Sequence, residues 1–419
     1  MSRIRLLKLA SIATVVCLGA ALAAPAGAQA DRGNIDGELV IASLSPETGD
    51  LSAILESLRV PVEIAVDEIN AAGGVLDTDV RHVTGDDGTD TAVASVTLDR
   101  LLTSDKVDAI MGPAGSTTVA GLLDKIETNA AVMCTGSATS PALSPKGIGG
   151  GYFFRTAPPD KLQAPALGDL IVSDGFSRVA IVALNDDYGQ GFAKALKKSL
   201  KQGGAKIVAD VPYEPGGGPY DTDAQAAADK SPDAVALIAF PDTGATMLQA
   251  FIAAGIGPAD VQIYTTDGLD SSSIPEAVDP ANLGVLDGLK GTTPAAAPAA
   301  IEHPFQEEFA ATGVDAVFSS YFYDCAILTA LAAVKANSDD PAKIRKAFKK
   351  NLTGKTHCQT FADCKAALED GKSINYDGAS SEFKKFSDHE PLSGVYDVYT
   401  FDGAGEKSTL GDDAQISIG

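Results

Sequence analysis

The chain has 419 residues and a formal net charge of −24, and 45% of its residues are hydrophobic while 21% are charged. This composition indicates a globular protein, long enough for two or three domains with cores of their own. The negative charge argues against binding to nucleic acid or to an anionic membrane surface. The alternative explanation of the negative charge is solubility or adaptation to salt, without a binding function.

The first thirty residues have the pattern of a secretory signal peptide. Basic residues precede an apolar stretch at 9–24, and Ala28-Gln29-Ala30 has the small-x-small form of a cleavage site. No later segment approaches the roughly 18 apolar residues of a membrane span. We therefore predict a signal peptide at 1–30 and a periplasmic or other extracytoplasmic location. A lipid anchor at Cys17 is not expected, because the residues before it do not match a lipoprotein signal.

Four cysteines remain after this cleavage, and an even number in an exported protein favours disulfides. Cys358 and Cys364 are close enough in sequence to close a small loop, which leaves Cys134 and Cys325 as a long-range pair. The sequence alone does not settle this pairing. No metal site or cofactor is expected, because no Cys-x-x-Cys occurs and the four histidines do not cluster.

Short apolar segments alternate with amphipathic segments, a pattern that predicts parallel β-sheets covered by helices. The first series has predicted strands at 38–46, 80–87, 107–114 and 130–137, with helices at 51–72, 91–102 and 116–129 between them. The second series has predicted strands at 178–186, 206–213, 233–240 and 261–268, again separated by helical segments. Further helices at 319–336 and 341–350 and a strand at 394–402 complete the prediction. The chain therefore contains two α/β units.

Ligands of open parallel sheets bind outside the carboxyl ends of the strands, so the loops after the strands are candidate sites. Ser116 lies at the predicted start of a helix, where Thr117 and its neighbours offer hydroxyls and N–H groups to a carboxylate or phosphate. Simple helix capping is the alternative. The loop "TGSATSP" at 135–141 offers a second such set at a neighbouring strand end. Together the two loops suit a carboxylate.

Two further residues could meet other parts of a ligand. Asp267 follows an apolar strand and could pair with an ammonium group, although an aspartate before Gly268 also suits an ordinary turn. Tyr188 in "NDDYGQG" could cover a ligand from the second unit, or it could pack on the surface.

Enzyme signatures are scarce in this chain. It contains no G-x-S-x-G elbow, no phosphate-binding loop and no histidine near Ser116. The segment "GDDGTDT" lacks the terminal glutamate of a calcium loop. We therefore expect no catalytic residues; hydrolysis by Ser116 is the alternative.

With these loops in view, the chain resembles the leucine/isoleucine/valine-binding type of periplasmic binding protein, the substrate-binding component of branched-chain amino acid ABC transporters. The segments that carry the resemblance are, in order, "EINAAGG", "VDAIMGPAGSTT", "SATSPAL", "YFFRTAPPD", "VAIVALNDDYGQG", "SSYFYDCAILTALAA" and "INYDGASSEFKKF". The last block resembles that of a subgroup with cysteines like Cys358 and Cys364.

The resemblance implies two Rossmann-like lobes with parallel sheets, joined by a hinge of three chain crossings. On this basis we predict lobe I at 37–158 and 293–373, and lobe II at 159–292 and 374–419. It also implies that Ser116, Ala138 and Thr139 bind an α-carboxylate with Ser137 beside them, that Asp267 takes the α-ammonium and that Tyr188 covers the ligand.

The resemblance implies a monomeric protein that captures an amino acid with an aliphatic or branched side chain and delivers it to a membrane ABC permease. Three departures leave the side chain open: the aliphatic Leu51, Ile54 and Leu55 where the family often has an aromatic residue, Phe240-Pro241 where a tyrosine is common, and an aspartate at 267 where glutamate is common. Members of the family also bind amides, urea and aromatic acids. A ligand sensor that serves a signalling receptor would have the same fold.

Overall fold

The computed structural model describes residues 35–216 and 218–419. The predicted signal peptide and Cys17 lie outside the described residues. Within the described ranges, no helix is both long enough and apolar enough to cross a membrane.

The first sheet has five parallel strands in the order β2-β1-β3-β4-β5. The strands are β1 (Val40–Ser45), β2 (Arg81–Asp86), β3 (Ala109–Met111), β4 (Val132–Thr135) and β5 (Phe153–Arg155). The helices that connect them are α1 (Leu55–Ala71), α2 (Thr91–Thr103) and α3 (Ser116–Asn129). Every residue of β1 is buried, as expected for a central strand covered on both faces. This sheet is the centre of lobe I.

The second sheet has eight strands in the order β14-β13-β10-β9-β8-β6-β7, with β15 paired to β13. The strands are β6 (Arg178–Leu184), β7 (Lys206–Tyr213), β8 (Ala234–Ile238), β9 (Gln262–Thr265), β10 (Lys290–Pro294), β13 (Gly394–Phe401), β14 (Lys407–Thr409) and β15 (Ile416–Ile418). The helices are α4 (Asp160–Ser173), α5 (Asp187–Gln202), α6 (Asp221–Ala228), α7 (Pro241–Ala253) and α8 (Ile274–Val278). Strands β6 to β10 run parallel, and β13 to β15 add antiparallel pairs at one edge. This sheet is the centre of lobe II.

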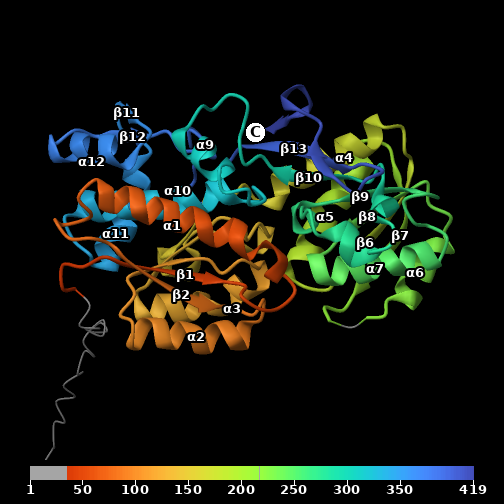
Figure 1. The fold of residues 1–419 in the computed structure, drawn as a ribbon, viewed down its shortest axis with the longest axis horizontal. Helices are drawn as coiled ribbons and strands as arrows, with labels where there is room; N and C mark the ends of the chain where they lie inside the picture. The colour runs from red at the N-terminus through yellow and green to blue at the C-terminus, as the bar shows by residue number, and fades with distance from the viewer. Residues whose placement is uncertain (1–34, 217) are drawn as a thin grey trace, which may run out of the picture. The chain divides into compact units, whose positions relative to one another are not determined.

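The chain then returns to lobe I. This return segment contains α9 (Pro304–Ala310), α10 (Ser319–Ala336), α11 (Pro341–Ala347), β11 (Thr356–Cys358), α12 (Phe361–Glu369) and β12 (Ile374–Tyr376). The long helix α10 is buried from Ser319 to Ala333 and packs against α1 and β4. In Figure 1 the return segment lies beside α1, far from it in sequence.

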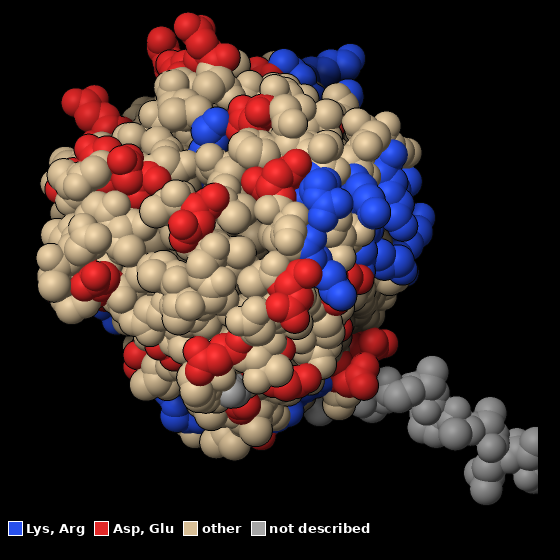
Figure 2. All heavy atoms as spheres, turned by 90° about the vertical axis from the view of Figure 1, so that its right-hand side faces the viewer, with Lys and Arg blue, Asp and Glu red and all other residues tan. Residues whose placement is uncertain are grey.

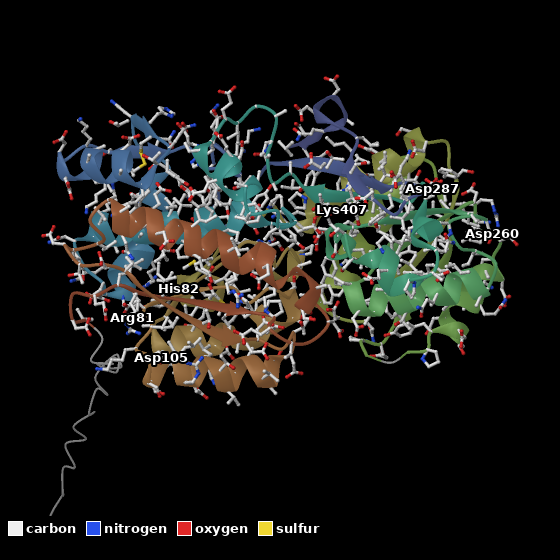
Figure 3. All side chains as sticks on the ribbon, in the orientation of Figure 1. Arg81, His82, Asp105, Asp260, Asp287 and Lys407 are labelled. Carbon is white, nitrogen blue, oxygen red and sulfur yellow. A yellow bond between two sulfur atoms is a disulfide. The ribbon has the colours of Figure 1, made fainter. Side chains whose placement is uncertain are left out.

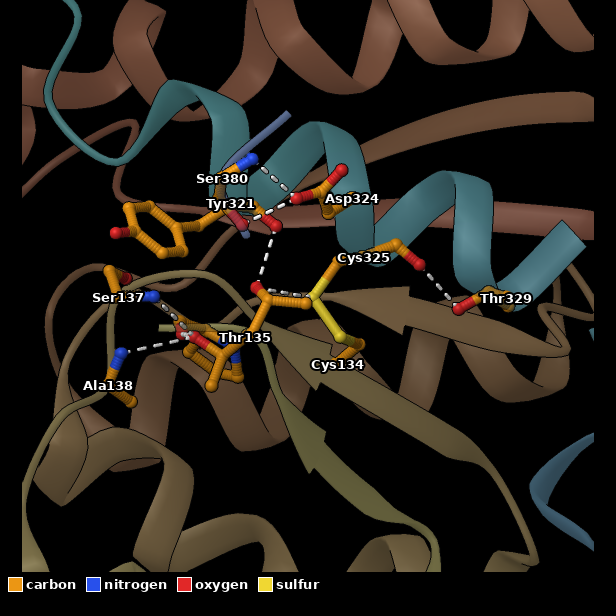
Figure 4. The surroundings of a disulfide bond; sticks show 11 residues. Cys134, Thr135, Ser137, Ala138, Tyr321, Asp324, Cys325, Thr329 and Ser380 are labelled. Atoms are coloured by element: carbon orange, nitrogen blue, oxygen red, sulfur yellow. Dashed lines mark hydrogen bonds between the residues drawn. A yellow bond between two sulfur atoms is a disulfide. The ribbon is translucent and has the colours of Figure 1, made fainter. Parts of the chain in front are cut away.

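Both predicted disulfides are present. Cys134 at the end of β4 is bonded to Cys325 in α10, and Cys358 is bonded to Cys364 across the small loop between β11 and α12. The first bond therefore ties the return segment to the sheet of lobe I (Figure 4).

In the described part of the chain, three segments cross between the lobes: the one after β5, the one after β10 and the one after β12. The lobe boundaries as a whole remain a prediction. However, β12 pairs with β11, and Asp324 of α10 binds Tyr376, Ala379 and Ser380. These contacts hold 374–380 against the return segment of lobe I, so the third crossing falls between Ser380 and Gly394.

Figure 2 shows one face of the molecule, at the lobe II end. Acidic side chains are scattered over this face, while basic side chains gather along one side of it. Dispersed carboxylates of this kind keep a protein soluble, which agrees with the interpretation of the net charge from the sequence.

Candidate ligand site

The carboxyl ends of the parallel strands in both lobes border one small cavity. The residues that line it are Leu51, Ile54, Ala114, Gly115, Ser116 and Ser137 of lobe I, Tyr188, Phe240, Asp267 and Gly268 of lobe II, and Phe318 of the return segment. Its volume is about 20 Å³, room for about one water molecule. An amino acid can therefore enter only if the lobes separate or side chains move. Four predicted site residues line the cavity: Ser116, Ser137, Tyr188 and Asp267.

The N-terminus of α3 supplies the positive side of the site. The first N–H groups of a helix have no partner within the helix, and the helix dipole favours an anion there. The residue before the helix is Gly115, which has no side chain to accept hydrogen bonds from these N–H groups. The Ser116 hydroxyl accepts a hydrogen bond from the N–H of Ser140 at 3.1 Å, which leaves its own hydrogen available to a ligand.

Thr117, the next predicted site residue, does not line the cavity. Its hydroxyl accepts a hydrogen bond from the N–H of Asp187 at 3.1 Å and lies 3.4 Å from the Asp186 carboxylate. Both partners belong to lobe II. Thr117 therefore joins the lobes in this arrangement.

The loop that follows β4 is held by its own hydroxyls. Thr135 Oγ1 accepts hydrogen bonds from the N–H groups of Ser137 and Ala138, both at 3.3 Å (Figure 4). The Ser137 hydroxyl donates to the carbonyl of Ala114. Gly136 packs so tightly on α10 that a Cβ there would lie 2.5 Å from the Phe322 ring. The small residues of this loop thus serve close packing, and the N–H of Ala138 points at Thr135.

Tyr188 and Phe240 form the aromatic wall of the cavity. Their rings are stacked, with centroids 5.3 Å apart and planes 7° apart. The Tyr188 hydroxyl lies 2.6 Å from Thr266 Oγ1 and donates weakly to Asp267 Oδ1 at 3.4 Å. Asp186 caps α5 through the N–H of Gly189, which sets the position of Tyr188 in the first turn.

Asp267 brings a buried carboxylate to the cavity. It lies in a short 3₁₀ helix, Asp267–Leu269, directly after β9, and it is only 4% exposed. Burial raises its pKa from 3.8 to about 7, although Gln163 and Tyr188 stabilise the charged form by hydrogen bonding. A buried carboxylate with so little compensation favours a cationic partner.

Asp160, which was not among the predicted site residues, is a second buried carboxylate near Asp267. It is the first residue of α4, it is fully buried, and neither of its oxygens has a hydrogen-bond partner among the described residues. Burial and the charge of Asp267 raise its pKa well above the ordinary value, while the nearby Thr139 hydroxyl lowers it. Thr139 Oγ1 also lacks a partner within hydrogen-bond distance in the described chain. One sequence signal could have drawn attention to Asp160: it stands directly after Pro158-Pro159, at the start of a helix.

The cavity therefore brings together a helix N-terminus, which favours an anion, the buried carboxylate of Asp267, with that of Asp160 near it, and apolar walls between two α/β lobes. This is the arrangement of a class of protein that encloses a small polar ligand. The family model described as periplasmic binding protein matches residues 38–402. The chain belongs to the periplasmic binding protein family, and the predicted resemblance to its leucine/isoleucine/valine-binding type is confirmed.

Named relatives show the same relationship. The chain is 27% identical over 375 residues to the chemotactic signal transduction system substrate-binding protein BasB of Halobacterium salinarum, with 85% of each chain covered. It is 27% identical to the leucine-, isoleucine-, valine-, threonine- and alanine-binding protein of Pseudomonas aeruginosa, covering 74% of this chain and 82% of that protein. The crystal structure of a leucine-binding protein, LivK, from Thermotoga maritima superposes with a TM-score of 0.74 at 20% identity, covering 91% of this chain and 98% of that one. This last likeness confirms the predicted fold, that of a type I periplasmic binding protein.

Proposed function

We propose that this protein is an exported, monomeric solute-binding protein that captures an aliphatic α-amino acid between its lobes and delivers it to an ABC permease. The observation that carries the proposal is the buried carboxylate of Asp267, which faces the same small cavity as the N-terminus of α3. An α-amino acid carries one positive and one negative group and can satisfy both ends.

The two ends of the ligand would be met by different lobes. Its carboxylate would bind Ser116 and the N–H groups at the start of α3, and its ammonium would pair with Asp267 and lie near Asp160. A ligand that bridges the lobes stabilises the closed arrangement, because it makes both sets of contacts only there. The protein's task is then binding and release, with no covalent step.

The apolar walls favour an aliphatic side chain. Leu51, Ile54 and Phe318 line the cavity together with the Tyr188–Phe240 stack, and all five side chains are at most 8% exposed. Burying each methylene of a ligand there stabilises the complex by roughly 0.8 kcal/mol. Relatives that are named as leucine-, isoleucine- and valine-binding proteins support the same class of ligand.

The experiment that tests the proposal is a thermal-shift panel on the mature protein, followed by calorimetry. The panel contains the twenty amino acids, amides, urea and aromatic acids, since a ligand that binds the folded state raises the melting temperature. Asp267→Asn is expected to weaken amino acid binding by about 10- to 100-fold, because it removes a charge-assisted hydrogen bond.

Asp260→Asn is the matched control for this variant. It makes the same chemical change at an exposed position far out on lobe II (Figure 3), so amino acid affinity should stay at the wild-type value. A thermal shift from an aromatic acid or an amide, with none from any amino acid, would reject the proposed ligand class.

A second candidate is the same binding event read by a signalling receptor. BasB, whose name places it in chemotactic signal transduction, matches the chain over 85% of its length. Deleting the gene separates the two roles: loss of labelled amino acid uptake supports delivery to a permease, whereas intact uptake with lost chemotaxis supports the sensor.

A further inference from the structure

A buried ion pair contacts the loop that follows β4, and neither of its residues lines the cavity. Arg155, the last residue of β5, is fully buried, and Glu390 in the third crossing is 2% exposed. The Arg155 guanidinium binds Glu390 through both Nε and Nη2, and the N–H of Arg155 donates to the carbonyl of His389 at 2.8 Å. The end of β5 is thus joined to the third crossing.

The remaining donors of Arg155 all bind the segment 138–144. Nη1 donates to the carbonyl oxygens of Ala138 and Ser140, both at 2.9 Å, and Nη2 donates to the Ser144 hydroxyl at 3.0 Å. A guanidinium has five N–H donors in one plane, and here all of them have acceptors. A lysine ammonium could not reproduce this set, because it is a compact point charge.

Residues of α4 in lobe II add two more hydrogen bonds to this group of contacts. Lys161 in the first turn of α4 donates to the other oxygen of Glu390 at 2.6 Å. The N–H of Asp160 donates to the carbonyl of Thr139 at 2.9 Å. The three consecutive carbonyls of Ala138, Thr139 and Ser140 are therefore all held from the hinge side.

The hydrogen bonds to the carbonyls of Ala138 and Thr139 fix the directions of the N–H groups that follow them in the chain. In a trans peptide the C=O and the following N–H point in opposite directions. With the Ala138 carbonyl on Arg155, the N–H of Thr139 points away from the guanidinium, and it has no hydrogen-bond partner in the described chain. With the Thr139 carbonyl on α4, the N–H of Ser140 reaches the hydroxyl of Ser116, which lines the cavity.

We propose that Arg155, held by Glu390, is a positioning residue for ligand binding: it orients the Ala138–Ser140 backbone so that Thr139 N–H and Ser116 are presented to a ligand carboxylate. Arg155 acts through this backbone and does not touch the ligand. The inference rests on the proposed function. Because Glu390 belongs to the third crossing, the same contacts tie the geometry of the loop to the hinge.

The test compares two probes that differ only at the carboxyl group, L-leucine and L-leucinamide. In Arg155→Lys the charge remains but the two carbonyls lose their common donor. We expect the preference for L-leucine over L-leucinamide, measured by calorimetry, to fall by about tenfold. A merely structural role for Arg155 would weaken both probes equally and leave the preference unchanged, and that result would overturn the inference.

Two further variants keep the test decisive. Arg155→Met combined with Glu390→Met removes both charges together, a change that folded proteins often tolerate, and it should reduce the preference to the same extent. Lys161→Met is the matched control, because it removes an ion pair with the same Glu390 but touches none of the three carbonyls. Its preference for L-leucine should equal that of the wild type.

A second readout needs no ligand. Hydrogen exchange of peptides that cover 136–144 should be faster in Arg155→Lys than in the wild type or Lys161→Met, while peptides from β6 stay unchanged. If the wild type binds no amino acid, the proposed function fails, and this exchange still tests the positioning. Unchanged exchange in 136–144 would overturn the inference in either case.

Discussion

Gly191 of lobe II faces Ser140 of lobe I so closely that a Cβ at position 191 would lie 2.9 Å from the Ser140 hydroxyl. The same atom would lie 2.9 Å from Cδ of Pro141. Ser140 also donates a hydrogen bond to the carbonyl of Asp187 at 2.7 Å. These contacts exist only while the lobes are together, so a side chain at 191 acts on closure.

Gly191→Ala should therefore weaken ligand binding without harming the fold. Gly191 lies inside α5, where alanine is favoured over glycine by roughly 0.5–1 kcal/mol. Forcing a methyl group into the lobe contact costs about 1–3 kcal/mol in the closed state. We expect a melting temperature of the ligand-free protein at or above the wild-type value, with an affinity about tenfold lower by calorimetry.

Gly203→Ala is the control for this variant. A Cβ at position 203 would lie 2.9 Å from Cγ2 of Val172, a contact that lies entirely within lobe II. This variant should lower the melting temperature and leave the affinity close to the wild-type value. Equal affinity of Gly191→Ala and the wild type would show that the lobes do not approach this closely when ligand is bound.

The prediction from sequence succeeded where local pattern decides structure. The alternation of apolar and amphipathic segments placed the strands. The rule that ligands bind at the ends of parallel strands selected Ser116, Ser137, Tyr188 and Asp267, which border one cavity; their role as ligand contacts stays a prediction. The cysteine count and spacing also led to both disulfides.

The prediction fell short where tertiary contacts decide. Thr117 bonds to lobe II and the N–H of Ala138 turns toward Thr135, and neither direction can be read from a loop sequence. Asp160 and Arg155 lie at the first crossing, whose burial depends on segments more than two hundred residues away, such as Glu390. Pattern analysis sees only neighbours along the chain.

The bond between Cys134 and Cys325 should contribute more stability than the bond between Cys358 and Cys364. The first links residues 191 apart and the second residues 6 apart. In the loop-entropy model these separations correspond to about 5 and about 2 kcal/mol. Replacing each pair by alanine and measuring urea unfolding tests the order. A larger loss from the Cys358–Cys364 pair would mean that the small loop is stabilised by more than chain entropy.

The pH dependence of stability should report the burial of Asp267. Its pKa in the folded protein is raised from 3.8 to about 7, so between these values the folded state holds a proton that the unfolded state releases. The contribution of this group to stability is therefore fully present below about pH 4 and is lost as the pH rises through 7. Asparagine cannot titrate, so Asp267→Asn should gain melting temperature relative to the wild type as the pH rises from 4 to 8.

Asp86→Asn should show the opposite trend and serves as the control. Burial is the largest single influence on Asp86 and raises its pKa, but hydrogen bonds from Thr48, Gly88 and Glu47 together outweigh it, so its pKa is lowered. Its stabilising contribution is present at neutral pH and is lost as the pH falls, which makes the variant comparatively least stable at pH 8.

An amino acid ligand should also raise the wild-type melting temperature more at pH 8 than at pH 5, because its ammonium then meets an ionised Asp267. If the ligand raises the melting temperature equally at pH 5 and pH 8, its ammonium does not pair with Asp267.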